Sequence, residues 1–165
     1  MSDPDLHITF VCTGNICRSP MAEKVVEAHL QRADLGNRVR VSSAGTGGWH
    51  VGDEADPRTN DVLRAHGYPV GHAATQVDEH HLDADLIVAL DTGHRRDLAR
   101  LGVPSDRLRL LRSFDPDADG DDVADPYYGD ADGFEEVLTQ IEAAVPGLLE
   151  WVRERLPATV DSCDD

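Results

Sequence analysis

Apolar and polar positions recur along the chain with two different periods, which predict strands and helices in turn. The apolar run at residues 6–11 predicts a buried strand. Apolar residues three or four positions apart over residues 21–33 then predict an amphipathic helix that ends near Gly36. The alternating residues 39–43 predict a second strand, and the continuous apolar run 85–90 predicts a strand covered on both faces.

The rest of the chain continues this alternation. Asp-Pro and Asp-Thr pairs predict helix starts in residues 56–67 and 91–101, and residues 108–111 predict a short fourth strand. Residues 113–132 are acidic and carry no secondary-structure signal, which is typical of a functional or disordered loop. Residues 134–156 show the clearest helical period of the chain.

Strands that alternate with helices predict an α/β fold of three layers, a parallel sheet with helices on both faces. The 165 residues are expected to form one domain, residues 1–165, in which residues 1–5 and 157–165 are flexible. Pro146 and Gly147 interrupt the last helical pattern and predict a kink. Such sheets bind ligands beyond the carboxyl ends of their strands, which directs attention to the loop after the first strand.

That loop, residues 12–18, lies between a strand end and a helix start. Ser19 is a favourable N-cap and Pro20 suits a first helical residue. Free backbone N–H groups and the positive end of the helix dipole then point at one spot, which is an anion-binding geometry. We therefore predict a phosphate loop after the first strand.

Four residues of the loop fit this chemistry. Gly14 lets the backbone turn in closely, and Asn15 tolerates a left-handed conformation. Arg18 carries a planar fork that can hold two oxygens of one phosphate. The same positive field favours the thiolate form of Cys12, which would stand beside a bound phosphorus atom as a nucleophile.

Cysteines also admit other interpretations. Cys12 could be a buried structural thiol, the common fate of a free cysteine. Cys12 and Cys17 could bind a metal, but no second Cys or His pair has complementary spacing. The pair at residues 80–81 likewise lacks partners at metal spacing, so we predict no metal site. Cys163 is expected to be an incidental exposed thiol.

The composition limits the possible partners and compartments. Fifteen basic against 32 acidic residues give a formal net charge of −17, which argues against binding nucleic acid or anionic membranes. No apolar run is long enough to span a membrane, and the first residues lack a signal-peptide profile. Three cysteines do not make a disulfide scaffold, so we expect a reducing cytoplasm, with leaderless secretion left open.

Several segments together carry a family resemblance. Residues 11–23, Val-Cys-Thr-Gly-Asn-Ile-Cys-Arg-Ser-Pro-Met-Ala-Glu, and residues 125–128, Asp-Pro-Tyr-Tyr, resemble the low-molecular-weight protein tyrosine phosphatases over about residues 6–156. Residues 43–50 and 64–69 look most like the actinobacterial branch, which includes a secreted mycobacterial enzyme. The resemblance implies the strand order 2-1-3-4 and the hydrolysis of phosphotyrosine.

This reaction requires a general acid, because the leaving phenolate must be protonated. Pro126 restricts Asp125 to extended conformations, and Tyr127 and Tyr128 offer flat walls for an aromatic ring. The neighbouring residues 115–122 contain many other aspartates, and only the match to the family's acid loop selects Asp125. The resemblance thus implies Cys12 as nucleophile, with Asp125 as acid and then as base.

The expected reaction has two steps and no cofactor. Cys12 attacks phosphorus to give a phosphocysteine, and water then releases phosphate. The phosphate is expected to be held by Arg18 and by a loop made of Thr13, Gly14, Asn15, Ile16, Cys17 and Arg18. Because Cys12 must be ionised while Asp125 is protonated, the rate should be bell-shaped in pH with an acidic to neutral optimum. Expected partners are phosphotyrosine proteins, phosphate-like anions should inhibit, and the chain is expected to be a monomer.

The resemblance also implies supporting roles. Ser19 would hydrogen-bond the Cys12 thiolate, and the loop would be held in shape by Asn15, Ser43 and His72. Without the match, His72 would read as an ordinary histidine. The substrate cleft would be lined by Thr13, Ile16, Trp49, His50, Tyr127 and Tyr128. A reversible Cys12–Cys17 disulfide would protect the nucleophile, although Cys17 could equally be a small packed residue.

Other functions remain as alternatives. Arsenate reductases of this fold need further relay cysteines near residues 75–95, and there are none. Arginine phosphatases carry threonine at the position of Ile16 and lack the paired tyrosines. A non-catalytic phosphotyrosine-binding or redox-sensing module is disfavoured because every catalytic residue type is present.

Overall fold

The computed structural model describes residues 5–127, 129 and 131–156. The expectations about the two ends of the chain therefore lie outside the described residues, apart from Asp5, and so do those about Cys163 and Tyr128. No helix in the described part of the chain is long and apolar enough to cross a lipid bilayer. The elements, in chain order, are β1 (Leu6–Cys12), α1 (Arg18–Arg32), β2 (Val39–Gly45), α2 (Pro57–Ala65), α3 (Glu79–Leu82), β3 (Leu86–Ala89), α4 (Thr92–Arg100), η1 (Ser105–Arg107), β4 (Leu108–Leu110), η2 (Leu111–Phe114) and α5 (Ala131–Arg155).

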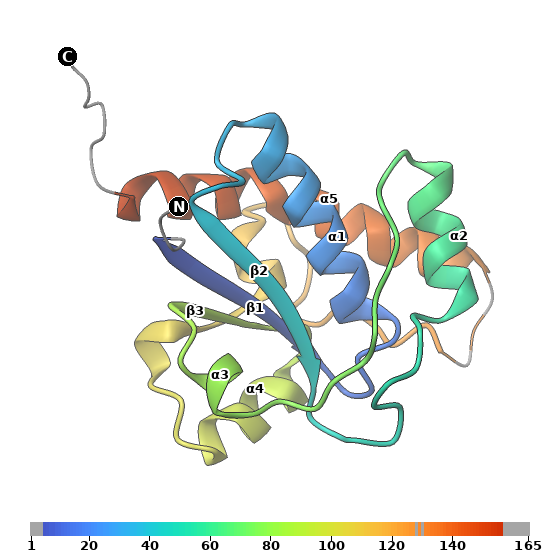
Figure 1. Ribbon diagram of the computed structural model, residues 1–165, viewed down its shortest axis with the longest axis horizontal. Coiled ribbons are helices and arrows are strands. Elements are labelled where there is room, and N and C mark those ends of the chain that lie inside the picture. Colours follow the sequence, from blue (N-terminus) through green and yellow to red (C-terminus); the bar gives the residue numbers. More distant parts are fainter. Residues whose placement is uncertain (1–4, 128, 130, 157–165) are drawn as a thin grey trace.

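The four strands form one parallel sheet in the order β2-β1-β3-β4, as predicted (Figure 1). In the register of the sheet, Cys12 lies opposite Gly45, and Val11 lies opposite Ala89. The carboxyl ends of the three neighbouring strands β2, β1 and β3 therefore meet at one edge. The strand order reverses between β1 and β3, which is where a sheet of this kind opens a crevice for ligands.

Helices cover both faces of the sheet, so the three-layer prediction is confirmed (Figure 1). Helices α1, α2 and α5 pack together on one face, and α3 and α4 lie on the other. On β3, Leu86 and Val88 belong to the larger core under α1 and α5, while Ile87 and Ala89 belong to the smaller core under α4. This alternation explains why the strand reads as a continuous apolar run.

The structure corrects several boundaries. Helix α1 ends at Arg32, where Gly36 was predicted, because the chain leaves the helix through the left-handed residue Asp34, φ 61°. The short helix α3 was not predicted, since four residues carry too little periodicity. Part of the loop predicted at 113–132 is η2 and the first turn of α5. Helix α5 continues past Pro146, and the kink there stays a prediction.

Candidate active site

The phosphate loop turns its carbonyl groups outward. Four of its carbonyl oxygens accept hydrogen bonds from the surrounding protein: Cys12 from Thr46 N (2.9 Å), Thr13 from Gly47 N (3.0 Å), Asn15 from His72 Nε2 (2.7 Å) and Ile16 from Asp56 N (2.8 Å). The peptide planes that point their carbonyls away from the centre of the loop point their N–H groups toward it. The loop therefore presents amide donors around one point, as an anion site requires.

Asn15 fixes the shape of the loop from inside. It is fully buried and left-handed, with φ 60°, as the sequence predicted. Its Oδ1 accepts from Thr75 N at 2.9 Å, so its amide nitrogen must face the hydroxyls of Ser19 (2.8 Å) and Ser43 (3.0 Å). Ser43 in turn donates to Glu23.

This arrangement sets the direction of the hydrogen bond at Cys12. The Ser19 hydroxyl accepts from Asn15, so its own proton is free to be donated to Cys12 Sγ, which lies 2.9 Å away. Such a bond stabilises a thiolate more than a thiol. Ser19 was also predicted to cap α1, and that prediction is wrong: the cap position is Cys17, and no side chain caps the helix.

Arg18 is held by Asp91, which follows β3 and caps α4, and by the backbone of Val123. Its Nη1 donates to Asp91 Oδ2 at 3.0 Å and to the Val123 carbonyl at 2.7 Å, and the side chain is almost completely buried. Its Nη2 lies 3.7 Å from Asp125 Oδ2. The guanidinium is thus anchored on one edge and directed at the pocket with the other.

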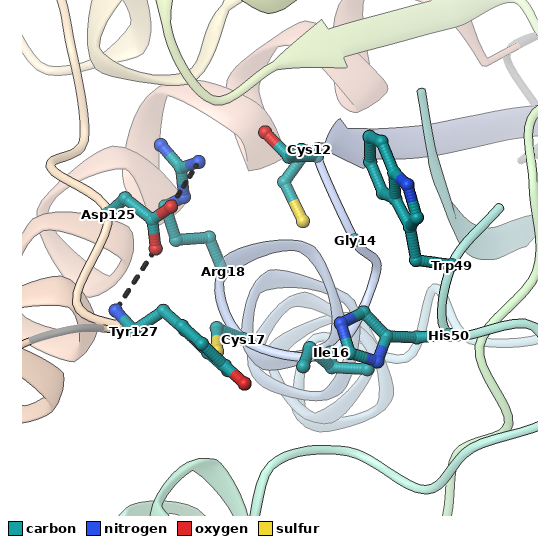
Figure 2. Close-up of a pocket in the computed structure, with 10 residues that line it drawn as sticks. Cys12, Gly14, Ile16, Cys17, Arg18, Trp49, His50, Asp125 and Tyr127 are labelled. Atoms are coloured by element: carbon teal, nitrogen blue, oxygen red, sulfur yellow. Dashed lines mark hydrogen bonds and ion pairs between the residues drawn. The ribbon is translucent and has the colours of Figure 1, made fainter. Parts of the chain in front are cut away.

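Asp125 lies beside the Arg18 guanidinium, across the pocket from Trp49 and His50 (Figure 2). Its Oδ1 accepts from Tyr127 N at 3.0 Å, and its side chain is 48% exposed. Cys12, Arg18 and Asp125 line one pocket of about 370 Å³. The other residues along its walls are Thr13, Gly14, Ile16, Cys17, Trp49, His50 and Tyr127.

The aromatic side of the pocket depends on close packing by two glycines. Trp49 is 75% exposed, and its indole occupies the space where a side chain at Gly47 would stand. A Cβ at Gly14 would lie 3.0 Å from the ring of His50. Trp49 and His50 therefore reach the pocket because the facing backbone has no side chains.

Two buried groups near Cys12 are held in their neutral forms. Burial, followed by the charge of Asp56, raises the pKa of Cys17 to about 12. Burial, followed by the charge of Arg18, lowers the pKa of His94 to about 4. Both groups are therefore uncharged at neutral pH.

The sequence matches the family described as "Low molecular weight phosphotyrosine protein phosphatase" over residues 7–158. The chain belongs to this family. It is 62% identical over 158 residues to low molecular weight protein-tyrosine phosphatase A of Mycobacterium tuberculosis, which covers 94% of this chain and 96% of that protein. A Streptomyces coelicolor relative, a low molecular weight protein-tyrosine-phosphatase, is 57% identical over 90% of this chain and 94% of its own. The crystal structure of a protein tyrosine phosphatase from Entamoeba histolytica superposes with a TM-score of 0.86 at 32% identity, covering 90% and 97% of the two chains.

All the residues around this pocket are ones that the resemblance implied, but Asn15 and Ser19, which it also implied, do not line the pocket. Ser43 and His72 do not line the pocket but hold the loop through Asn15, and Tyr128 lies outside the described residues. In the described part of the chain, no three His, Cys, Asp or Glu side chains gather closely enough to hold a metal ion.

Sequence reasoning missed four residues that support the site. Asp91 anchors Arg18 and accepts from His94 N, and His94 Nε2 lies 2.8 Å from Thr13 Oγ1. Asp91 follows a buried strand at its carboxyl end, a position that could have identified it. Asp56 and Arg58 join the loop to the segment that carries Asp125. No local pattern signals their role, because their partners are distant in the sequence.

Proposed function

We propose that the chain hydrolyses phosphotyrosine in proteins through a phosphocysteine on Cys12. The observation that supports this most is the single pocket into which Cys12, Arg18 and Asp125 all face, with Trp49 and Tyr127 along its sides. A nucleophile, an anion clamp and a proton donor are the three components that phosphoryl transfer from an aryl ester requires.

In the first step, the thiolate of Cys12 forms an S–P bond while the bond from phosphorus to the phenolic oxygen breaks. Asp125 gives its proton to that oxygen, so neutral tyrosine leaves. Arg18 and the inward amides of the loop hold the equatorial oxygens, where negative charge must be stabilised. The Ser19 hydroxyl, 2.9 Å from Sγ, stabilises the sulfur anion.

In the second step, water attacks phosphorus, gives a proton to Asp125, and the S–P bond breaks to regenerate the thiolate and release phosphate. Because the first step needs ionised Cys12 and protonated Asp125, the rate is expected to be bell-shaped in pH. Neither step needs a metal ion, since Arg18 and the loop amides supply the positive field.

Aryl phosphates fit the pocket better than other phosphoryl substrates. The nucleophile lies on the buried floor, with Cys12 3% exposed, while Trp49 and Tyr127 stand at the rim. In a phosphotyrosine substrate, the flat ring spans the distance from the phosphate on the pocket floor to the peptide at the rim. The aromatic side chains at the rim favour contact with such a ring. We infer that phosphate-like anions inhibit by occupying the loop.

The remaining expectations are proposals that follow from charge and composition. With a net charge of −17, the chain acts on phosphoproteins as a monomer and binds neither nucleic acid nor anionic membranes. We place it in the cytoplasm, where Cys12 and Cys17, both free and buried, stay reduced. Oxidation would join these two thiols and protect Cys12; in Cys17→Ala, activity after peroxide and reductant should recover less than in the parent.

The test is phosphate release from a phosphotyrosine peptide, compared with phosphoserine and phosphoarginine peptides and with arsenate reduction. We expect release from phosphotyrosine alone, its loss in Cys12→Ser, and its retention in the control Cys163→Ser. Rapid acid quench of labelled substrate should trap label on the parent protein but not on Cys12→Ser. Release that persists without Cys12 contradicts the proposal.

A further inference from the structure

We propose that Arg58 is a positioning residue that, with Asp56, holds the acid Asp125 in register with the phosphate loop. The inference rests on the proposed function, because it concerns the acid of that reaction. Arg58 lies outside the lining of the pocket, so any effect on the reaction must pass through other residues. A continuous series of hydrogen bonds connects the two catalytic segments through it.

The series begins at the phosphate loop. Asp56 N donates to the Ile16 carbonyl at 2.8 Å, and Thr59 Oγ1 reaches the Cys17 carbonyl at 3.4 Å. Both donors belong to the start of α2, where Asp56 is the N-cap. The first turn of α2 is therefore fixed directly to the backbone on which Cys12 and Arg18 stand.

Both oxygens of the Asp56 carboxylate accept hydrogen bonds from Arg58. Oδ1 accepts from Arg58 N at 2.9 Å and from Nε at 3.0 Å, and Oδ2 accepts from Nη2 at 3.0 Å. Burial works to raise the pKa of Asp56, but the hydrogen bonds and charge of Arg58 outweigh it and leave the pKa lowered. The carboxylate is thus a fixed anionic anchor for the guanidinium.

The other edge of the guanidinium holds the acid segment. Nη2 donates to the Tyr127 carbonyl at 2.9 Å and Nη1 to the Gly129 carbonyl at 3.0 Å. Tyr127 N in turn donates to Asp125 Oδ1 at 3.0 Å. The centre of the guanidinium also lies 4.5 Å from the Phe134 ring, which stacks it against the start of α5.

This design explains why the residue is an arginine. Only a guanidinium offers enough donors in a rigid plane to hold a carboxylate on one edge and two carbonyls on the other. The side chain of Asp125 is half exposed, so burial alone does not fix its position. General acid catalysis requires hydrogen-bond reach of the leaving oxygen, and a small displacement of Asp125 removes it.

The experiment compares Arg58→Met and Arg58→Lys with Arg64→Met, which removes an exposed arginine from the same helix. The kcat/KM is measured for phenyl phosphate, whose leaving group needs the proton, and for 4-nitrophenyl phosphate, whose leaving group needs it far less. We expect Arg58→Met to lower kcat/KM about tenfold or more for phenyl phosphate but within about threefold for 4-nitrophenyl phosphate, as a partial loss of acid catalysis worth 10²–10⁴. The kcat/KM of Arg58→Lys for phenyl phosphate should lie between the values of the parent and of Arg58→Met. The kcat/KM of Arg64→Met should match that of the parent.

A double-mutant cycle separates this proposal from the proposed function. Asp125→Asn should show the same substrate selectivity, and adding Arg58→Met to it should change kcat/KM for phenyl phosphate by less than about threefold, since the two act on one step. Equal losses on both substrates in Arg58→Met would overturn the positioning role. If Asp125→Asn shows no selectivity, the assignment of the acid itself fails. Should Arg58→Met not fold, Arg58→Lys carries the same comparison, and its failure to discriminate between the substrates overturns the proposal.

Discussion

The two sides of the pocket are built in opposite ways. The nucleophile side is one continuous loop, in which Cys12 is 3% and Asn15 0% exposed, and its carbonyls are bonded to the surrounding protein. The acid side is an irregular segment in which Asp125 is 48% and Tyr127 37% exposed. It is joined to the nucleophile side through Arg18 and Arg58.

The reaction proposed above accounts for this difference. A site for a phosphate dianion must have its donors fixed before the substrate arrives, because reorganising dipoles during the reaction raises the barrier. A general acid must instead exchange its proton with solvent at every turnover, so it needs exposure. We therefore expect substitutions on the acid side to lower activity with little effect on the free energy of unfolding. Substitutions on the nucleophile side should lower both.

The largest effect is expected for Asp125→Asn, which tests whether the acid side affects activity without affecting stability. Removing the acid should lower kcat/KM for phenyl phosphate about 10²- to 10⁴-fold. The free energy of unfolding should change by no more than about 0.5 kcal/mol, as is usual for an exposed residue. Steady-state kinetics and urea unfolding measure the two quantities, and a large loss of stability would contradict the division between the two sides.

On the nucleophile side, Asn15→Ala should lower both the activity and the free energy of unfolding. The substitution removes the partners of Ser19, Ser43 and Thr75 and places alanine at positive φ. Buried groups left without partners cost about 1–3 kcal/mol each, so unfolding should shift by at least that amount and activity should fall at least about tenfold. Asn15→Gly restores the backbone freedom but not the hydrogen bonds, and the difference between the two variants measures the cost of the left-handed backbone.

A smaller effect is expected at the aromatic rim. In Gly47→Ala the new methyl group takes the place of the Trp49 indole, which can swing away because it is exposed. We expect KM for a phosphotyrosine peptide to rise about twofold to tenfold, the value of an aromatic contact of about 0.5–1.5 kcal/mol. Fluorescence in a Trp151→Phe background reports the movement of Trp49, and Val51→Ala on the same loop is the control. An unchanged emission would show that the indole has not moved.

A last prediction concerns the pH dependence of stability on the nucleophile side. The pKa of His94 is about 4 in the folded protein, below its ordinary 6.5, so between these values the unfolded chain binds a proton that the folded protein does not. Stability from this group is complete above pH 6.5 and is lost as the pH falls toward 4. In His94→Asn, the free energy of unfolding should rise less steeply with pH in this window. The difference in slope should correspond to the uptake of up to one proton on unfolding. An unchanged slope would show that folding does not lower the pKa of His94.

The two sides also differ in how far the sequence predicted them. The anion loop, the left-handed Asn15 and the position after β1 followed from local patterns, and the fold class followed from alternation. Ser19 was wrongly predicted to be a helix cap. N-cap propensity is a local preference, whereas the Ser19 hydroxyl is engaged by Asn15 and Cys12. Asp125 could be chosen among many aspartates only through the family resemblance.

The sequence by itself predicted a parallel sheet, the anion loop and Cys12 as the candidate nucleophile, since these depend on signals that span a few neighbouring residues, while the strand order came from the family resemblance. Only the tertiary structure decided which carboxylates meet Arg18, that Asp91 stands behind it, and that Arg58 joins the two catalytic segments. These contacts join residues far apart in the chain. They exist because the parallel strands bring their carboxyl ends, and the loops that follow them, to one edge of the sheet.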